Sequence, residues 1–333
     1  MRKEMVYRGL VYVLLAAALS FTNAFGAEKV TIRYVPGLYA APLFIAADKG
    51  YFEEAGIKVD MGPISAVTEV VPLLSAGQLD VGIGGYGAGI FSAINDGINI
   101  RVVSPMAVYT KDSCPGPLMV RNGSGIKSVK ELKGKKVACA GMLVGGSGFQ
   151  LVQILEEHGL SGNDVILNNL RFPDQVIAMS QGAVDAAMAS EPFTTKMIQE
   201  KIATPIACVK PGTSVTGVVY GMKFMKDRSQ VAKNFMVALM KGFRGIQGKQ
   251  FFSTENLNIF SKYTKVEPEV IKKMSLFAWD PEMRIGTQTL LEQQSMYMRY
   301  GSLKYTTPLK PEQFIDNSFV SHALTVLGAY NKK

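Results

Sequence analysis

Short apolar runs alternate along most of the 333-residue chain with longer segments in which apolar residues recur every three or four positions. Alternating, β-branched runs such as 29–35 are typical of strands, and segments such as 42–55 end at a glycine that stops a helix. Strands and helices that alternate in this way build a mainly parallel sheet with helices on both faces. The first series comprises strands 29–35, 57–61 and 79–84, the extended stretch 98–109, and helices 42–55, 67–76 and 88–96.

The same pattern restarts after a turn-rich segment at 110–117. The second series comprises strands 118–121, 136–140, 165–170, 184–189 and 205–209, and helices 147–158, 174–181 and 193–201. A second turn-rich segment, 211–217, leads into strand 218–222 and then into mostly helical sequence, clearest at 229–246, 268–278, 286–300 and 311–327. We therefore predict an α/β protein of two lobes: 27–113 with 218–333 and its extra C-terminal helices, and 114–217, with crossovers near 110–117 and 211–217.

An internal similarity supports two related lobes. Segment 74–86 resembles 179–191 at an offset of 105 positions, and 53–57 resembles 156–160 at an offset of 103. Two stretches in the same order with nearly equal offsets favour a repeat, although helix-Gly-x-x-Asp-strand also recurs in unrelated α/β folds. Under this repeat Tyr86 and Glu191 occupy equivalent positions.

The first 26 residues have the three parts of a secretory signal peptide. Arg2, Lys3 and Arg8 precede the apolar run 10–19, and the small residues Ala24 and Gly26 follow at the −3 and −1 positions for cleavage. The run is shorter than the ~20 residues that span a bilayer. We expect residues 1–26 to be removed and the protein to be periplasmic.

The net charge of +9 raises the possibility of a nucleic-acid partner, which requires charge gathered in one patch. The densest cluster has no interleaved aromatic residue, and we interpret it as a solvated helix capped by Ser128-x-x-Glu131. We predict no nucleic-acid partner. The cluster consists of Lys127, Lys130, Lys133, Lys135 and Lys136.

Residues that carry catalysis or bind metals are scarce, with two His and three Cys in the chain. Cys139 and Cys208 lie in strand patterns and are predicted to be buried apolar residues, whereas Cys114 in the crossover is predicted to be exposed. His158 falls in the last turn of a helix, where a positive ring suits the dipole, and Trp279 is expected to pack between C-terminal helices. We therefore expect no metal, no cofactor and no enzymatic activity.

The glycine-rich segment 82–87 matches the dinucleotide fingerprint G-x-G-x-x-G. Such a site also needs an acidic residue about 20 positions later, and 99–111 contain none. We interpret the segment as a strand end that opens onto another ligand.

Ligands of open parallel sheets lie beyond the carboxyl ends of the strands, so the loops at these ends should line a cleft between the lobes. Residues 145–148 precede a helix, where free N–H groups and the Ser147 hydroxyl suit an anion; Ser147-x-x-Gln150 is also a capping box, and the two roles are compatible. The candidate ligand-binding residues are Tyr39, Ala40, Tyr86, Gly87, Tyr109, Met142, Gly146, Ser147, Gly148 and Glu191.

Segment 39–57, with its Ala-x-x-x-Gly-Tyr-Phe-x-x-x-Gly-Ile core, resembles the first helix of periplasmic solute-binding proteins of ABC importers. The group is the nitrate/sulfonate/taurine type, which includes binders of thiamine-pyrimidine precursors. Segments 74–84 and 189–192 resemble its Gly-x-x-Asp-x-Gly and Glu-Pro motifs. The resemblance implies a two-lobe class II periplasmic-binding-protein fold without catalysis, a monomer, and a membrane permease with its ATPase as partners.

One departure from this family concerns the ligand. Oxyanion-binding members often carry a small-hydroxyl-small sequence where this chain has Gly85-Tyr86-Gly87. Tyr39, Tyr86 and Tyr109 suggest an aromatic cleft for a planar ligand. We therefore expect a small organic anion, such as a sulfonate or aromatic carboxylate, with its charged end at Ser147. A ligand-sensing module for signalling and a pyrimidine-synthase-like enzyme remain alternatives, although that enzyme's His- and Cys-bearing motifs are missing.

Overall fold

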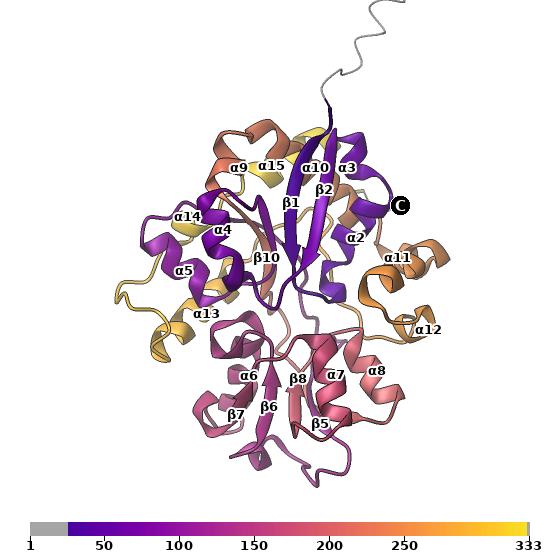
Figure 1. The fold of residues 1–333 in the computed structure, drawn as a ribbon, viewed down its shortest axis with the longest axis vertical. Helices are drawn as coiled ribbons and strands as arrows, with labels where there is room; N and C mark the ends of the chain where they lie inside the picture. Colours follow the sequence, from indigo (N-terminus) through magenta and orange to yellow (C-terminus); the bar gives the residue numbers. More distant parts are fainter. Residues whose placement is uncertain (1–25, 332–333) are drawn as a thin grey trace, which may run out of the picture.

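Two five-stranded sheets form the framework of the computed structural model, which describes residues 26–331. The predicted signal peptide, except Gly26, lies outside these residues. The first sheet has the order β2-β1-β3-β10-β4 and the second has the order β7-β6-β8-β5-β9 (Figure 1). Their strands are β1 (Glu28–Tyr34), β2 (Ile57–Pro63), β3 (Val81–Gly85), β4 (Arg101–Pro105) and β10 (Thr216–Tyr220), and β5 (Leu118–Arg121), β6 (Lys136–Cys139), β7 (Ile166–Asn168), β8 (Ala186–Met188) and β9 (Ala203–Ala207).

Both sheets have the same mixed topology. In the first sheet β1 is parallel to β2 and β3, and β10 runs antiparallel to β3 and β4. In the second sheet β6 is parallel to β7 and β8, and β5 runs antiparallel to β8 and β9. The antiparallel strand of each sheet is the one that the chain enters after leaving the other sheet. The predicted sheets are thus confirmed as mainly parallel, with one reversed strand each.

The internal sequence similarity corresponds to repeated backbone geometry. Gly77 and Gly182 both adopt the left-handed conformation that favours glycine, with φ of 69° and 70°. An aspartate then precedes the next strand in each half. The Asp80 carboxylate accepts a hydrogen bond from the Thr31 amide at 2.8 Å, and the Asp185 carboxylate accepts one from the Lys136 amide at 3.0 Å. Each aspartate ties the start of its own strand to the neighbouring parallel strand, β1 in the first sheet and β6 in the second.

Helices cover both sheets, and most of the C-terminal ones pack around the first sheet (Figure 1). Helix α10 packs against α2, and Gly242 permits this close approach because a Cβ there would lie 2.1 Å from the Pro42 carbonyl oxygen. The helices that precede β5 or follow β10 are α2 (Ala41–Asp48), α3 (Tyr51–Glu54), α4 (Val71–Ala76), α5 (Ala88–Asn95), α9 (Met222–Lys226), α10 (Ser229–Arg244), α11 (Thr254–Thr264), α12 (Pro268–Ile271), α13 (Thr287–Arg299), α14 (Pro311–Phe314) and α15 (Ser318–Leu327).

The second sheet carries fewer helices, and short 3-10 turns occur in both halves. Helix α6 follows β6, α7 follows β7 and α8 follows β8, as expected for strand–helix–strand units. The elements are α6 (Gly146–Glu157), α7 (Phe172–Ser180) and α8 (Phe193–Gln199), with 3-10 turns η1 (Leu38–Ala40), η2 (Val67–Val70), η3 (Val129–Leu132), η4 (Met142–Val144), η5 (Gly162–Asp164) and η6 (Gly248–Phe252).

Several predicted helices are shorter or divided. The helix predicted at 42–55 breaks at Gly50, whose φ is 73°. The one predicted at 311–327 is interrupted where Ile315 forms an isolated β-bridge with Val102. The one predicted at 268–278 stops at Ile271, and Ala278 instead pairs with Val108. Helix α11, capped by Ser253, was not among the predicted helices. In each divided helix, long-range backbone pairing or a glycine overrode the apolar period.

The cysteine prediction is partly wrong. Cys208 is not a buried apolar residue, because it is exposed and forms a disulfide with Cys114. The strand β9 ends at Ala207, which leaves Cys208 outside the sheet. Cys139 is buried on β6, as predicted. The bridge therefore joins the two segments through which the chain passes between the sheets.

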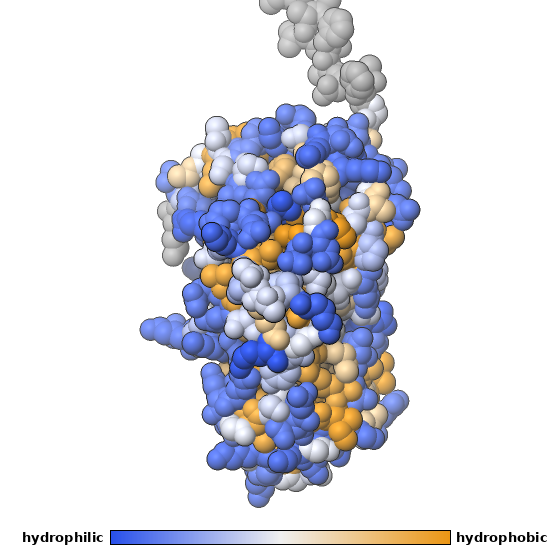
Figure 2. Space-filling model, turned by 90° about the vertical axis from the view of Figure 1, so that its left-hand side faces the viewer, coloured by the Kyte–Doolittle hydropathy of each residue, from blue (hydrophilic) through white to orange (hydrophobic). Residues whose placement is uncertain are grey.

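The surface is mostly hydrophilic in the view of Figure 2, with apolar areas on its upper and lower parts. The lysine cluster at 127–136 is exposed, as predicted. However, η3 is a single 3-10 turn, and the Ser128 hydroxyl donates to the Glu131 carboxylate instead of capping a helix. Lys241 and Lys262 form ion pairs with carboxylates at 2.8 Å. Within residues 26–331, no helix combines the length and apolarity needed to cross a membrane.

Candidate functional site

A cavity lies between the two sheets, beyond the carboxyl ends of β1, β3 and β6. Its volume, counted as the space that the centre of a water molecule can occupy, is about 40 Å³, within about 450 Å³ of unfilled space that includes the part open to solvent. Both halves contribute to its wall, and none of the lining residues described by the structure carries a formal charge. They are Val35, Tyr39, Ser65, Ala66, Gly85, Tyr109, Val215 and Thr216 from the first half, and Ala140, Gly146, Ser147, Gln150, Phe172 and Ser190 from the second.

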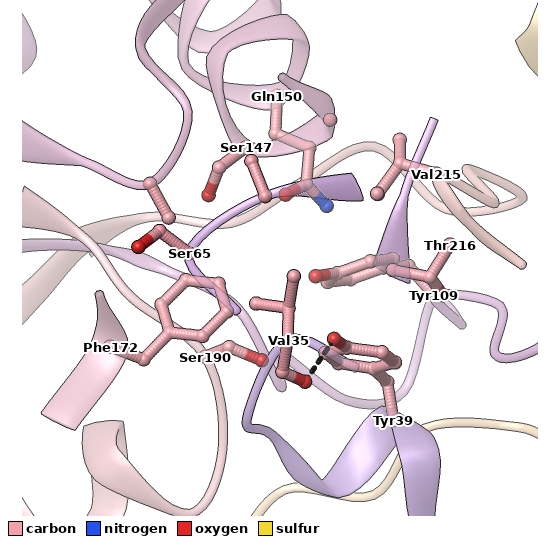
Figure 3. A pocket seen from close by; sticks show the side chains of 14 residues that line it. Val35, Tyr39, Ser65, Tyr109, Ser147, Gln150, Phe172, Ser190, Val215 and Thr216 are labelled. Atoms are coloured by element: carbon pink, nitrogen blue, oxygen red, sulfur yellow. Dashed lines mark hydrogen bonds between the residues drawn. The ribbon is translucent and has the colours of Figure 1, made fainter. Parts of the chain in front are cut away.

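Aromatic rings form two sides of the cavity. Tyr39 and Tyr109 lie on one side and Phe172 lies on the other (Figure 3). The Tyr39 hydroxyl donates a hydrogen bond to the Val35 carbonyl. Burial raises the pKa of both tyrosine hydroxyls, so they remain neutral at physiological pH. Such rings can hold a planar ligand through their faces.

A C-terminal segment supports these two tyrosines from behind. The Trp279 indole donates a hydrogen bond to the Tyr39 carbonyl at 3.0 Å, and Phe277 packs edge-on against Tyr109 with ring centroids 5.4 Å apart. Trp279 also stacks on Phe251 of η6 at 5.2 Å. This last contact agrees with the predicted packing of Trp279 between C-terminal elements. Its link to Tyr39 was not predicted, because it joins positions 240 residues apart.

The start of helix α6 borders the cavity. The helix begins at Gly146 with Gly145 as its N-cap, and no side chain caps it. The predicted capping box Ser147-x-x-Gln150 is therefore wrong, because Ser147 is already inside the first turn. Ser147 and Gln150 are one turn apart, and both line the cavity. The uncapped N–H groups and the dipole of this 12-residue helix provide a positive environment without a charged side chain.

The buried thiol behind Ser147 is chemically inert. Burial raises the pKa of the Cys139 thiol to about 12, against a smaller lowering by the Ser147 hydroxyl. A thiol of this kind stays protonated and is a poor nucleophile.

His158 caps the far end of α6, where its Nδ1 lies 2.8 Å from the Ile154 carbonyl oxygen, as its predicted structural role requires. Nowhere in the described part of the chain do three or more His, Cys, Asp or Glu residues gather as metal ligands could.

Glycines allow the two halves to approach each other at the rim of the cavity. A Cβ on Gly85 would lie 3.1 Å from the Gly146 amide nitrogen, and one on Gly146 would lie 3.0 Å from the Val215 carbonyl oxygen. A Cβ on Gly87 would lie 2.7 Å from the Val144 carbonyl oxygen. The glycine-rich strand end thus brings backbone from the second half close to the first. This closed arrangement, rather than a dinucleotide, accounts for the glycines at 85 and 87.

Replacing Gly87 by alanine should disfavour this closed arrangement. Its φ of −115° suits alanine, but the added methyl group would overlap Val144 backbone from the other half and the Thr68 side chain from its own half. We expect a larger radius of gyration by small-angle X-ray scattering. Gly89→Ala is the matched control, because its Cβ would meet only Thr68, at 3.2 Å. Identical scattering from both variants would contradict the inference.

Four of the ten predicted ligand-binding residues line the cavity: Tyr39, Tyr109, Gly146 and Ser147. Tyr86 does not line it. Its ring lies against Gly217, and its hydroxyl donates to the Ser104 carbonyl at 3.3 Å inside the first half. The expected three-tyrosine cleft therefore has two tyrosines. The remaining predicted residues that lie outside the lining are Ala40, Gly87, Met142, Gly148 and Glu191.

Glu191 lies at a junction between the halves. Its carboxylate accepts hydrogen bonds from the Thr195 amide at 3.1 Å, the Thr195 hydroxyl at 2.8 Å and the Ser275 amide at 3.1 Å. Its main-chain oxygen accepts from the Leu38 amide at 3.0 Å. Burial raises the pKa of Glu191, and these hydrogen bonds oppose the rise. Through its side chain and its main-chain oxygen the residue thus connects three segments, and it does not line the cavity.

Sequence reasoning missed part of the polar lining. Gln150 was considered only as part of a capping box, and Val215 and Thr216 fell within the turn-rich crossover. Phe172 could have been found, because it starts the helix that follows β7 and therefore lies near a strand end. The other missed residues are Val35, Ser65, Ala66 and Ala140, whereas Gly85 and Ser190 lie in strand-end loops that were expected to line the cleft. The cavity thus presents aromatic faces and hydrogen-bonding groups from both halves.

The model of the family described as NMT1/THI5 like matches residues 38–248. A 4-amino-5-hydroxymethyl-2-methylpyrimidine phosphate synthase from Aspergillus parasiticus is 24% identical over 153 residues, 46% of this chain. The match spans only 42% of that enzyme's length. A Brucella abortus protein named as a candidate binding protein is 26% identical over 330 residues, 91% of this chain and 96% of its own.

Solved structures share the fold at lower identity. The periplasmic nitrate-binding protein NrtA from Synechocystis is 15% identical, with 92% of this chain and 90% of that chain covered and a TM-score of 0.75. The ligand-binding component of an ABC-type import system from Staphylococcus aureus, with zinc bound, is 13% identical, with 89% and 99% covered and a TM-score of 0.72. The alkanesulfonate-binding protein SsuA from Xanthomonas axonopodis, bound to MOPS, is 16% identical, with 90% and 99% covered and a TM-score of 0.66.

These likenesses confirm the predicted fold, in which two sheets with flanking helices match those of periplasmic binding proteins. The family model covers well over half of the chain. The protein therefore belongs to the NMT1/THI5-like family.

Proposed function

We propose that this protein is the periplasmic substrate-binding component of an ABC importer, which binds a small organic anion and delivers it to a membrane permease. One observation carries the proposal: a neutral, aromatic cavity is enclosed between two similar halves, with the start of α6 at its wall. Its likeness to the binding component from Staphylococcus aureus supports the import role. We further propose export by the segment 1–26, action as a monomer, and the lobe boundaries given above, shifted so that all of β10 from Thr216 belongs to the first lobe.

The cavity favours a planar body with one negative charge. Tyr39, Tyr109 and Phe172 offer ring faces and edges to an aromatic ligand. The helix terminus carries the equivalent of about half a positive charge. Because no lysine or arginine lines the cavity among the described residues, a doubly charged ligand would be poorly compensated. We therefore propose an aromatic carboxylate or sulfonate, with the acid group at Ser147.

Isothermal titration tests this proposal directly. The protein is first unfolded and refolded to remove any bound solute and is then titrated with benzoate, benzenesulfonate, taurine and nitrate. We expect at least one of the two aromatic acids to bind at least ~10-fold more tightly than taurine and nitrate, because only these acids can stack. No binding by either aromatic acid would contradict the proposed ligand class.

An enzyme related to the pyrimidine phosphate synthases is the second candidate, because 153 residues of this chain are 24% identical to such a synthase from Aspergillus parasiticus. The cavity provides little for such chemistry. Its lining side chains in the described chain include no imidazole, thiol or carboxylate, the groups that most often serve as acid, base or nucleophile. We therefore propose binding without catalysis.

A further inference from the structure

Two buried polar atoms at the cavity have no hydrogen-bond partner within residues 26–331. They are Nε2 of Gln150 and Oγ1 of Thr216. Both residues line the cavity, and Gln150 is only 4% exposed. The unpaired atoms come from opposite halves, since Gln150 lies on α6 and Thr216 begins β10.

The side chain of Gln150 extends from α6 toward Tyr109, with Thr216 beside the tyrosine ring (Figure 3). Ser147 lies one helical turn before Gln150 on the same wall. The amide and the threonine hydroxyl are thus positioned to contact the body of a ligand whose acid group lies at Ser147.

Other buried amides in the chain show what is unusual about Gln150. Gln294 donates to the Leu309 carbonyl at 3.0 Å and accepts from the Tyr305 hydroxyl at 2.9 Å and the Leu309 amide at 2.7 Å. Gln175 and Gln293 leave an oxygen unpaired but still donate through nitrogen. In Gln150 the donor itself is unpaired: its side chain faces the Tyr109 hydroxyl closely enough to lower the pKa of that group slightly, yet Nε2 makes no hydrogen bond.

Leaving a buried donor unpaired is costly, by roughly a factor of 5 to 150 in the folding equilibrium, and most buried polar groups in folded proteins are paired. A ligand that supplies an acceptor would remove this cost only when it is bound. Ligands with such an acceptor therefore bind more tightly than ligands without one, because a ligand without the acceptor leaves the amide unpaired.

We propose that Gln150 and Thr216 form a second polar subsite, which binds a hydrogen-bond acceptor on the body of the ligand. The ligand class is then an aromatic acid that carries a ring nitrogen, carbonyl or ether oxygen in addition to its acid group. This inference rests on the proposed function, and it makes Gln150 the residue that distinguishes such ligands from plain aromatic acids.

The test compares benzoate with picolinate, nicotinate and isonicotinate, which differ from it only by a ring nitrogen at three positions. For the unmodified protein we expect at least one pyridinecarboxylate to bind at least ~10-fold more tightly than benzoate. Gln150→Leu should abolish this preference while changing benzoate affinity less than ~3-fold. Because the amide is unpaired, Gln150→Leu should melt at the same temperature as the parent or higher.

Gln153→Leu on the same helix is the matched control, because Gln153 does not line the cavity. It should keep the pyridinecarboxylate preference. If Gln150→Leu melts at a lower temperature and loses affinity equally for all four acids, Gln150 has a structural role and the inference is overturned. Equal binding of benzoate and the pyridinecarboxylates to the parent would also overturn it, while leaving the proposed function intact. No binding by any probe would overturn both.

Discussion

Ser147→Asp is expected to weaken the binding of an aromatic acid by at least ~100-fold. Ser147 lies in the first turn of α6 and lines the cavity, so the new carboxylate would face the acid group of the ligand. Two like charges about 4 Å apart repel by about 4 kcal/mol at an effective dielectric constant of 20. Titration with benzoate, or with the tightest-binding aromatic acid, measures the loss.

The fold should tolerate this substitution. A carboxylate in the first turn of a helix interacts favourably with the dipole, by about 0.3–1 kcal/mol. We therefore expect a melting temperature within a few degrees of the parent. Ser147→Asn provides the control, since asparagine has the shape of aspartate without its charge and should bind far more tightly than the aspartate variant. Unchanged affinity in Ser147→Asp would remove Ser147 from the site.

Loss of the Cys114–Cys208 disulfide is expected to lower the free energy of unfolding by ~4–5 kcal/mol, because the bridge closes a loop between residues 94 positions apart. All five strands of the second sheet, β5 to β9, lie within this loop. The Cys114→Ser/Cys208→Ser variant should therefore lose hydrogen-exchange protection mainly in the second sheet. Denaturant unfolding and hydrogen exchange together measure the two effects.

Reducing agent supplies a second measurement. Cys208 is exposed, so the bridge is accessible, whereas Cys139 is buried and unpaired. Reductant should destabilise the parent protein and leave the double serine variant unchanged. A double variant as stable as the oxidised parent would show that the bridge does not constrain the chain in this way.

The sequence predicted the arrangement of the sheets because the relevant signals are local and repeated. Gly77 and Gly182 recur at the same offset as Asp80 and Asp185. In each half the glycine adopts the left-handed conformation, and the aspartate accepts a hydrogen bond from a backbone amide of the neighbouring strand. A glycine that ends a helix and an aspartate that precedes a strand are recognisable without knowledge of the rest of the chain.

The site was predicted less completely, because strand-end position does not determine side-chain direction. Tyr86 and Glu191 follow equivalent strands, as the repeat predicts, yet both turn away from the cavity. The Tyr86 ring packs against Gly217, and the backbone amides of Thr195 and Ser275 donate hydrogen bonds to the Glu191 carboxylate. These partners lie far away in the sequence or on the next helix, and their positions depend on packing.

The sequence alone determined the α/β class, the two similar halves, the family resemblance and the helix start at which Ser147 lies. These features follow from periodicity, glycine and proline positions, and short motifs. Only the tertiary structure decided that Cys208 pairs with Cys114, that Trp279 supports Tyr39, and that Gln150 and Thr216 face one cavity. Each of these contacts joins distant segments, and their proximity is set by how the sheets and helices pack.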